Sequence, residues 1–248
     1  GISSQNVSFP IEVLIADDCS SDNTKSVIME WYENNQNNVR LCFNKDNVGP
    51  NRNFANVLNE AKGKYIAICE GDDYWTDPAK LQKQIDFMEN NPDFSVCFHD
   101  VKIQNEITGT SENHSDVCKK VLHTGVTVFL ESDILSENFI PTLSVLYRRF
   151  DFTFPDWFYT FPFCDWTLHV MAAHEGKIKY MPDIMGVYRI HSNGIWSSKS
   201  LEFREQAVSK FYQKMCSFLG DQYSDYIVNI LTDQKMNYVR YSSELIDA

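Results

Sequence analysis

The chain has 248 residues, of which 43% are hydrophobic, and a formal net charge of −12 at pH 7. This length and composition exclude a disordered chain and indicate one α/β domain, or such a domain with an appendage. The excess of 34 acidic residues over 22 Lys and Arg argues against a protein that grips a nucleic-acid backbone. An anionic small substrate would therefore need local neutralisation, by a metal ion or by selected Arg and His side chains.

The cysteines are seven in number and are scattered singly, without a Cys-x-x-Cys pair. Cys42, Cys69 and Cys97 lie in apolar runs, where a free thiol behaves as a small buried hydrophobe. This pattern argues against a disulfide scaffold and a zinc site, and it fits a reducing cytoplasm. With no signal peptide and no apolar run near the roughly 18 residues of a transmembrane helix, we expect a cytoplasmic protein whose membrane contact is at most peripheral, at the inner face.

Apolar runs typical of strands alternate with helical patterns through the first hundred residues. Val27, Val57 and Ile85 mark the apolar faces of three expected helices. The strands expected between them cover Ile11–Ala16, Val39–Phe43, Tyr65–Cys69 and Phe94–Phe98. Because strands that alternate with helices need crossover connections, this order predicts a Rossmann-like α/β fold with a mostly parallel, doubly wound sheet.

The second half of the chain is less regular. Lys102–His123 is polar and indicates a surface excursion, while aromatic side chains crowd Phe150–Phe163, where they line a cleft or pack beneath one. Further elements are expected as strands at Val126–Leu130, Phe139–Tyr147 and Ile184–Ile190, and as a helix at Cys164–His174.

After Ser198 the pattern changes to two amphipathic helices, with apolar residues such as Phe211 in the first and Ile227 in the second. We therefore predict a main domain over residues 1–198 and a C-terminal helical extension over residues 199–248.

Two of the expected strands run directly into acids, at Asp17-Asp18 and at Glu70-Gly71-Asp72-Asp73. In a doubly wound sheet both strand ends face one crevice at the same edge, where ligands bind. Carboxylates are hard oxygen ligands suited to Mg²⁺ or Mn²⁺. An isolated acidic turn is usually a solvated loop, so the presence of two such strand ends is what indicates a ligand site.

Three stretches of the chain resemble the family 2 glycosyltransferases of the GT-A fold. They cover residues 12–24, 46–92 and 164–197, and together they span most of residues 11–198. The resemblance implies transfer of a hexosyl or N-acetylhexosaminyl group from a nucleotide diphosphate sugar, usually a UDP-sugar, with inversion at the anomeric carbon. The implied acceptor is a saccharide or a lipid-linked saccharide, as in polysaccharide biosynthesis.

The resemblance also implies roles for residues at the donor. Asp18 matches the acid that hydrogen-bonds the uracil. The Asp72-Asp73 pair matches the DXD-type motif, with Asp73 as a ligand of Mn²⁺ or Mg²⁺ and Asp72 nearer the ribose or a metal-bound water. Arg189 and His191 match positions near the diphosphate, where a histidine could also ligate the metal.

Asp165, in Cys164-Asp165-Trp166, matches the acid that serves as the general base. Such a reaction needs cations at the leaving diphosphate and one base on the acceptor side of the sugar, because inversion takes a single displacement. The structural alternative for Asp165 is the N-cap of the following helix. Asp156 and Glu175 are the next acids to consider as the base.

Two departures from the family pattern are visible. The family normally opens with an apolar strand, a turn and a helix before the first acid pair, whereas Gly1–Pro10 resembles only the tail of that helix. The absent strand is central in the family's sheet, so we expect that its neighbours close up, that another segment or a second copy of the chain fills the gap, or that the chain is truncated. In addition, Phe54-Ala55 stands where the family has Arg-Asn, and Arg52 lies two residues earlier.

Two other functions are alternatives to sugar transfer. A sugar-nucleotide pyrophosphorylase should carry a Gly-rich phosphate loop with Arg near its N-terminus, and the sequence shows none. A catalytically degenerate module that binds a nucleotide sugar or a glycan is favoured by the missing strand. It is opposed by the joint presence of Asp72, Asp73 and Asp165.

Overall fold

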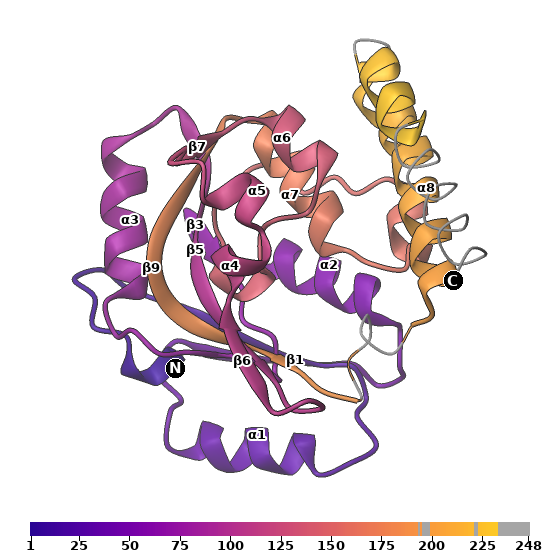
Figure 1. Cartoon of the computed structure of the whole chain (residues 1–248). Coiled ribbons are helices and arrows are strands. Elements are labelled where there is room, and N and C mark those ends of the chain that lie inside the picture. The colour runs from indigo at the N-terminus through magenta and orange to yellow at the C-terminus, as the bar shows by residue number, and fades with distance from the viewer. Residues whose placement is uncertain (193, 195–198, 221–222, 233–248) are drawn as a thin grey trace. The chain divides into compact units, whose positions relative to one another are not determined.

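The computed structural model describes residues 1–192, 194, 199–220 and 223–232 (Figure 1). The contacts within it divide the chain into two compact units, Gly1–Gly194 and Ile195–Ala248. The first unit is a mixed α/β structure, and the second is helical in its described part.

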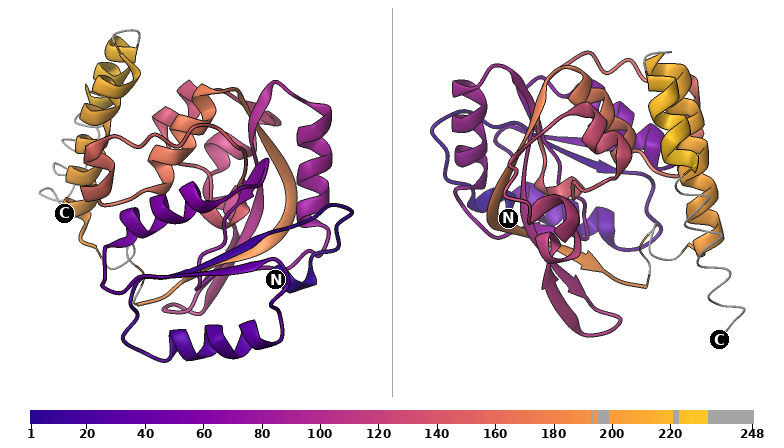
Figure 2. Two further views of the ribbon diagram at one scale, coloured as in Figure 1. Left: turned by 180° about the vertical axis from the view of Figure 1, so that it is seen from behind. Right: turned by 45° about the horizontal axis from the view of Figure 1, so that its top comes forward.

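The first unit begins with a small parallel sheet. Strand β1 (Val13–Asp17) pairs in parallel with β2 (Val39–Phe43), and helix α1 (Thr24–Glu33) makes the crossover between them. Helix α2 (Pro50–Glu60) follows β2 and lies on the other side of this pair from α1 (Figures 1 and 2). These elements lie close to where the apolar pattern of the sequence predicts them.

The larger sheet has seven strands, and its main path runs β3-β8-β5-β9-β4. The long strands β5 (Phe94–Asn105) and β9 (Lys177–Ile190) are parallel, and β6 (Thr110–Asn113) and β7 (Val128–Phe129) pair with them at the sides. The remaining strands of the path are β3 (Tyr65–Ala67), β8 (Leu146–Arg148) and β4 (Tyr74–Trp75).

Every described pairing in this sheet except β5–β9 is antiparallel. The sheet is therefore mixed, whereas the alternation of strands and helices predicted mostly parallel pairs. Parallel neighbours need a long crossover connection, and the connection from β5 to β9 supplies one through several helices. The four-residue turn between β5 and β6 permits only a hairpin.

The range Lys102–His123 was expected to be an irregular surface segment, but it begins with this hairpin. Along β5 the exposed Lys102 and Gln104 alternate with the buried Val101 and Ile103, so one face of the strand is polar. Three short helices lie in the connection that follows: α4 (His114–Val117), α5 (Lys119–Leu122) and α6 (Glu131–Ser136).

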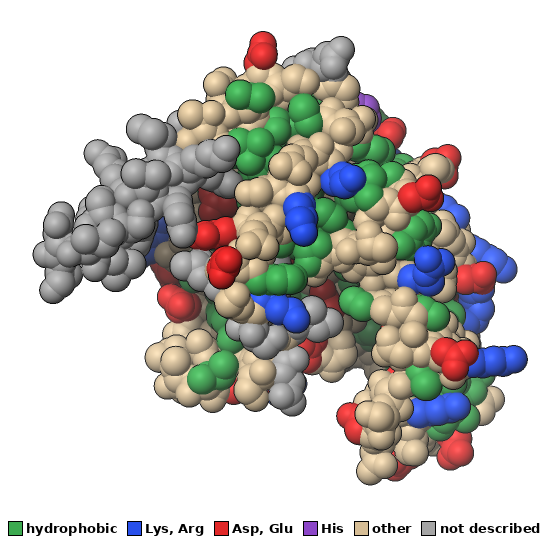
Figure 3. Space-filling model, turned by 90° about the vertical axis from the view of Figure 1, so that its right-hand side faces the viewer, with side chains coloured by type: hydrophobic (Ala, Val, Ile, Leu, Met, Phe, Trp, Pro, Cys, Tyr) green, Lys and Arg blue, Asp and Glu red, His purple; other side chains and the backbone are tan. Residues whose placement is uncertain are grey.

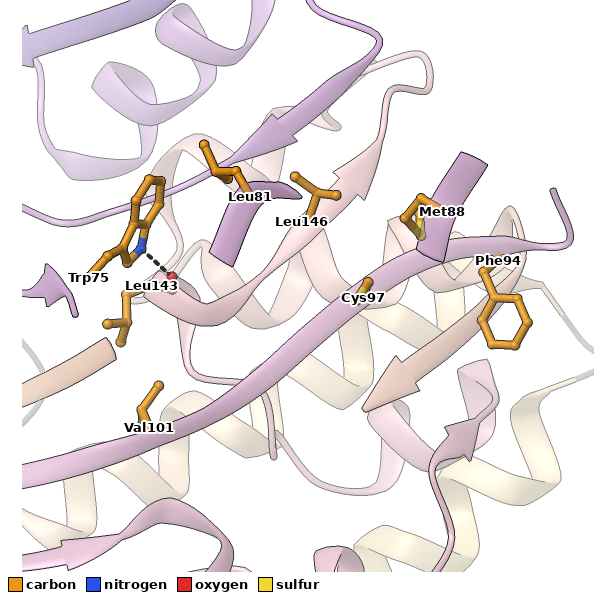
Figure 4. Close-up of a cluster of buried hydrophobic side chains, with 8 residues drawn as sticks. All are labelled: Trp75, Leu81, Met88, Phe94, Cys97, Val101, Leu143 and Leu146. Carbon is orange, nitrogen blue, oxygen red and sulfur yellow. Dashed lines mark hydrogen bonds between the residues drawn. The ribbon is translucent and has the colours of Figure 1, made fainter. Parts of the chain in front are cut away.

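Helices cover both faces of the larger sheet (Figures 1 and 2). Helix α3 (Lys80–Asn90) lies on one face, and α6 and α7 (Asp165–His174) lie on the other. The core beneath α3 is shown in Figure 4, where Trp75 Nε1 donates a hydrogen bond to the Leu143 carbonyl at 2.8 Å. The other side chains of this cluster are Leu81, Met88, Phe94, Cys97, Val101 and Leu146.

Among the described residues, β1 and β2 do not pair with β3, which is the edge of the larger sheet. Within the described residues, the β1-β2 pair and the seven-stranded sheet are thus two separate hydrogen-bonded sheets. The segment expected to be a helix tail forms only one 3-10 turn, Ile2–Ser4. The residues after it hydrogen-bond to the start of α3 instead, since Asn6 N–H donates to Pro78 O at 2.7 Å and Gln5 Oε1 accepts from Leu81 N–H at 3.0 Å.

The described part of the second unit consists of two helices. Helix α8 (Leu201–Leu219) begins at Ser200, whose Oγ accepts a hydrogen bond from Phe203 N–H, and residues 224–232 are also helical. These are the two helices that the amphipathic pattern predicts; residues 233–248 lie outside the described part. Within the described part, no helix combines the length and the apolar character needed to span a bilayer.

Candidate active site

The acids after β3 form a tight turn that ends in β4, and Asp73 N–H donates to Glu70 O at 3.2 Å within it. Strand β4 pairs with β9 so that Tyr74 lies opposite Val187. This pairing brings the end of β9, with Arg189 and His191, against the acid turn. The two parts of the site that the sequence analysis grouped around the diphosphate are therefore adjacent.

The Asp72 carboxylate faces His191, whose Nε2 lies 2.9 Å from Asp72 Oδ2. Both side chains line a shallow, open concavity of about 530 Å³. Thr24 at the start of α1 lines the same concavity, so the loop after β1 and the turn after β3 face one another there. The other lining residues are Gly71, Glu106, Arg189 and Ser192.

The contact between Asp72 and His191 is a direct hydrogen bond, or an ion pair when the histidine is protonated, and its length also matches the spacing of two ligands of one metal ion. Two ligand atoms at right angles around an ion, each about 2.1 Å away, are about 3.0 Å apart. In the described part of the chain, no third His, Cys, Asp or Glu joins them to complete a ligand set. A Mg²⁺-like ion normally takes one or two protein ligands and fills its other positions with water and substrate phosphate, so two ligands are sufficient for such an ion.

Asp73 has a different environment from Asp72. Its Oδ1 accepts the backbone N–H of Arg189 at 2.8 Å, and it is not among the residues that line the concavity. Burial, with a further contribution from the Asp72 charge, raises the pKa of Asp73 to about 6 against that hydrogen bond. The geometry thus favours Asp72 over Asp73 as the acid that faces a metal.

The Arg189 side chain holds the acid turn in place through hydrogen bonds. Its Nε donates to Glu106 Oε1 at 2.8 Å, and its Nη1 donates to the Asp72 carbonyl at 3.0 Å. Arg189 is also one of the residues that line the concavity. Arg189 therefore places a guanidinium, paired with the Glu106 carboxylate, beside Asp72 and His191, where the resemblance expects the diphosphate.

Asp165 is the first residue of α7, and its side chain is half-buried. The N-cap is Cys164, so the alternative of an N-cap role for Asp165 is wrong. Asn138 Nδ2 donates to Asp165 Oδ2 at 3.2 Å. Of the two other candidate acids, Asp156 lies exposed at the start of the 3-10 helix Asp156–Thr160, and Glu175 lies exposed at the far end of α7.

Glu70 is a site residue to which the sequence analysis gave no role. Its pKa is raised to about 8, first by burial and then by the Asp73 charge, with a smaller effect from Asp165. The Glu70 side chain is exposed at the surface, yet protein atoms crowd its carboxyl closely enough that desolvation is the largest cause of the raised pKa. After burial, the charges of Asp73, Glu70, Asp165 and Asp72 contribute to raising the pKa of Tyr188 to about 12, so these four acids act on one region of the protein.

Only one signal in the sequence pointed to Glu70, namely its position as the first acid after the strand. That signal locates the residue in the turn. It does not show that Asp165, ninety-five positions later, lies close enough to affect its ionisation.

The Asp18 carboxylate accepts hydrogen bonds from the loop that leads into α2. Its Oδ1 accepts from Val48 N–H and its Oδ2 from Gly49 N–H, both at 2.9 Å. Asn44 Nδ2 also donates to Oδ1 at 2.9 Å. The structure thus gives Asp18 a clear role in holding the loop, and its contact with a nucleobase stays a prediction.

The aromatic segment over residues 150–163 packs inward. Phe152, Phe154 and Phe158 are buried, and the Phe154 and Phe158 rings stack with centroids 4.2 Å apart. Helix α2 holds the segment through the buried Asn51, whose Nδ2 donates to the carbonyls of Phe158 and Phe161. These aromatic side chains therefore pack into the core, which is the packing role that was expected as the alternative to lining a cleft.

The comparison with protein families decides the class. The model of the family described as glycosyl transferase family 2 matches residues 4–151. The chain belongs to this family.

Charged side chains of both signs are interspersed on the face of the molecule shown in Figure 3, and no single basic patch gathers there.

Two relatives of this family member show how far the similarity extends. The Escherichia coli protein named UDP-Glc:alpha-D-GlcNAc-diphosphoundecaprenol beta-1,3-glucosyltransferase WfaP is 38% identical over 199 residues, which are 79% of this chain and 72% of that protein. An uncharacterized protein of Mycobacterium tuberculosis is 38% identical over 205 residues, 83% of this chain. The chain spans 57% of the length of that mycobacterial relative.

Solved structures confirm the GT-A fold. The mannosyltransferase PcManGT from Pyrobaculum calidifontis, in complex with GDP-Man and Mn²⁺, matches with a TM-score of 0.63 at 16% identity, over 87% of this chain and 58% of that one. Staphylococcus aureus TarS in complex with UDP matches with a TM-score of 0.55 at 18% identity, over 87% and 66% of the two chains. At such identities the similarity shows the fold alone.

Proposed function

We propose that this glycosyltransferase uses Mn²⁺ or Mg²⁺ to transfer a sugar, with inversion, from a UDP-sugar to a hydroxyl group of a saccharide or lipid-linked saccharide. The observation that carries the proposal is the pair of Asp72 Oδ2 and His191 Nε2, 2.9 Å apart in an open concavity lined also by Arg189. It is supported by the names of the proteins that the chain resembles, which include a UDP-Glc-dependent enzyme and complexes with UDP and with GDP-Man and Mn²⁺.

On this proposal, the residues at the donor neutralise the negative charge of the diphosphate. Asp72 and His191 would hold the ion, which when bound neutralises the diphosphate as it leaves. Arg189 adds a fixed guanidinium, held in place by Glu106 and by the Asp72 carbonyl. Asp73 acts indirectly, because its hydrogen bond to Arg189 N–H fixes the end of β9 against the acid turn.

The acceptor side needs one base. Asp165 takes the proton of the acceptor hydroxyl as the new bond from that oxygen to the anomeric carbon forms and the bond to the diphosphate oxygen breaks. Glu70, with its pKa raised to about 8, is mainly neutral at pH 7. A neutral carboxyl adds no repulsion toward the anionic donor, and it can donate a hydrogen bond to a substrate oxygen.

The test is hydrolysis of a panel of UDP- and GDP-sugars, followed as nucleotide release with Mn²⁺ and with EDTA. We expect release from at least one UDP-sugar that stops when EDTA removes the metal. Binding of a UDP-sugar without any turnover, in the presence of saccharide acceptors, would instead identify a nucleotide-sugar-binding module. Equal release in Mn²⁺ and EDTA would contradict the metal dependence.

A further inference from the structure

Asn138, in the segment between α6 and the 3-10 helix Thr142–Ser144, makes two hydrogen bonds with its side-chain amide. Its Nδ2 donates to Asp165 Oδ2 at 3.2 Å, and its Oδ1 accepts from Ile140 N–H at 3.4 Å. The opposite amide orientation would set the carbonyl oxygen against the carboxylate and the NH₂ group against an N–H donor. The hydrogen-bond network therefore fixes which atom faces Asp165.

The segment that carries Asn138 is itself fastened to α7. The Ile140 carbonyl lies 3.2 Å from His169 Nε2, and the Tyr147 hydroxyl lies 2.5 Å from His169 Nδ1. His169 and Tyr147 are fully buried, and burial lowers the pKa of His169 to about 4. The imidazole is thus neutral, with Nε2–H donating to Ile140 and Nδ1 accepting from Tyr147.

These contacts hold the segment to α7 at two points one helical turn apart, at Asp165 and at His169. A side chain that is aimed by a helix start and by a fixed amide has few alternative rotamers. In the described part of the chain, Asn138 provides the one side-chain hydrogen bond to Asp165. This bond engages Oδ2 and leaves Oδ1 to receive a proton.

We propose that Asn138 is a positioning residue for Asp165, holding the carboxylate in the orientation that receives the acceptor proton. The inference rests on the proposed role of Asp165 as the base. It goes beyond that role in assigning the control of its geometry to an amide 27 positions earlier in the chain. Misplacement of a reacting group by about 1 Å can cost about 100-fold in rate, so loss of the amide should affect turnover rather than donor binding.

The test is a double-mutant cycle on the UDP-sugar that the wild type hydrolyses fastest in the panel. The proteins are the wild type, Asn138→Leu, Asp165→Asn and the double variant, with Asn138→Ala as a second, smaller replacement. We expect Asn138→Leu to lower kcat about 10- to 100-fold while KM for the donor stays within about twofold. In the Asp165→Asn background the same change should have no further effect, because the group that it positions is already lost.

Glu137→Gln is the matched control, since Glu137 is the exposed neighbour of Asn138, and it should keep the wild-type kcat. Melting temperatures establish that each variant is folded. The inference is wrong if a folded Asn138 variant keeps its kcat, if it lowers kcat by the same factor with and without Asp165, or if neither variant folds, which would make Asn138 structural. A wild-type rate in Asp165→Asn alone would overturn the proposed base itself, a separate result.

Discussion

His191 and Asp72 are 119 positions apart in the chain, yet His191 Nε2 lies 2.9 Å from Asp72 Oδ2. Their proximity depends on the antiparallel pairing of β4 with β9, which sets Trp75 opposite Gly186. Gly186 has little free space, because a Cβ atom there would come within 2.8 Å of the Leu143 side chain. The candidate metal site is thus positioned by the core beneath it, where Leu143 also receives the Trp75 hydrogen bond.

A substitution at Gly186 should disturb the candidate metal site, although Gly186 is not one of its ligands. We expect Gly186→Val to lower the melting temperature and to weaken Mn²⁺-dependent binding of UDP, because either β9 or the buried Leu143 side chain must shift to make room. Overpacking of this kind typically costs about 1–3 kcal/mol in the free energy of unfolding. Thermal unfolding and calorimetric titration with UDP measure the two effects, and an unchanged UDP affinity would show that the site does not depend on this packing.

Asp18 offers a test of a loop-holding role. Replacing it by Ala leaves the Val48 and Gly49 N–H groups without their carboxylate, and each lost hydrogen bond to a charged group is worth about 1.5–3 kcal/mol when no water replaces it. We expect Asp18→Ala to destabilise the fold even in the absence of nucleotide. If chemical denaturation shows no loss of stability, the loop does not need Asp18, and the nucleobase contact becomes its better explanation.

The raised pKa of Glu70 predicts a pH dependence of stability. The folded pKa of about 8 lies above the model value of 4.5, so the folded state binds more protons than the unfolded state between these two values. The free energy of unfolding should therefore fall as pH rises through this window. Glu70→Gln should remove this part of the pH dependence when unfolding is measured in EDTA from pH 5 to 9. An unchanged slope would contradict the environment described for Glu70.

The lowered pKa of Lys80 predicts that stability changes with pH in the opposite direction. It is fully buried at the start of α3, where its Nζ donates to Gln84 Oε1 at 2.7 Å and lies 4.2 Å from the centre of the Trp75 ring. Burial lowers its pKa to about 7 from 10.5, so the unfolded state binds more protons between these values and stability should rise with pH there. In Lys80→Met this rise should disappear, and Gln82→Met on the same helix is the control.

Much of the fold could be predicted from the sequence because several of its strands begin as apolar runs bounded by turn-forming or acidic residues. The acids at the ends of β1 and β3, the helix that begins at Asp165 and the two C-terminal helices all follow from local patterns. The mixed direction of the sheet could not be predicted in the same way. The direction of a strand depends on its connection, and β4, β6 and β7 are too short or too polar to show a period.

The roles within the acid turn were the part of the site hardest to assign. Sequence spacing places Glu70, Asp72 and Asp73 in one turn, but it does not show which carboxylate faces outward. That is decided by the Arg189 N–H, which comes from a strand 116 positions away and engages Asp73. The pairing of Asp165 with Asn138 is equally non-local, since neither residue type is unusual where it stands.

Asp165→Asn separates a base from a structural residue. We expect the rate of transfer or hydrolysis to fall by about 10²–10⁴-fold, the range for loss of a general base, while UDP affinity and the melting temperature are kept. Glu175→Gln, at the other end of the same helix, is the control and should retain its rate. Steady-state kinetics with the UDP-sugar identified by the panel provides the measurement, and near wild-type turnover in Asp165→Asn would return the base role to another acid.

The central claim is that Asp72 and His191 hold a divalent ion at the nucleotide. Isothermal titration of UDP into the wild type and Asp72→Ala, each with Mn²⁺ and with EDTA, tests it most directly. The alanine keeps the backbone carbonyl that Arg189 bonds, so the brace on the turn remains. We predict that Mn²⁺ strengthens UDP binding by the wild type and has no effect on Asp72→Ala, whereas the exposed Asp46→Ala behaves as the wild type. Equal enhancement by Mn²⁺ in Asp72→Ala and in the wild type would contradict the account.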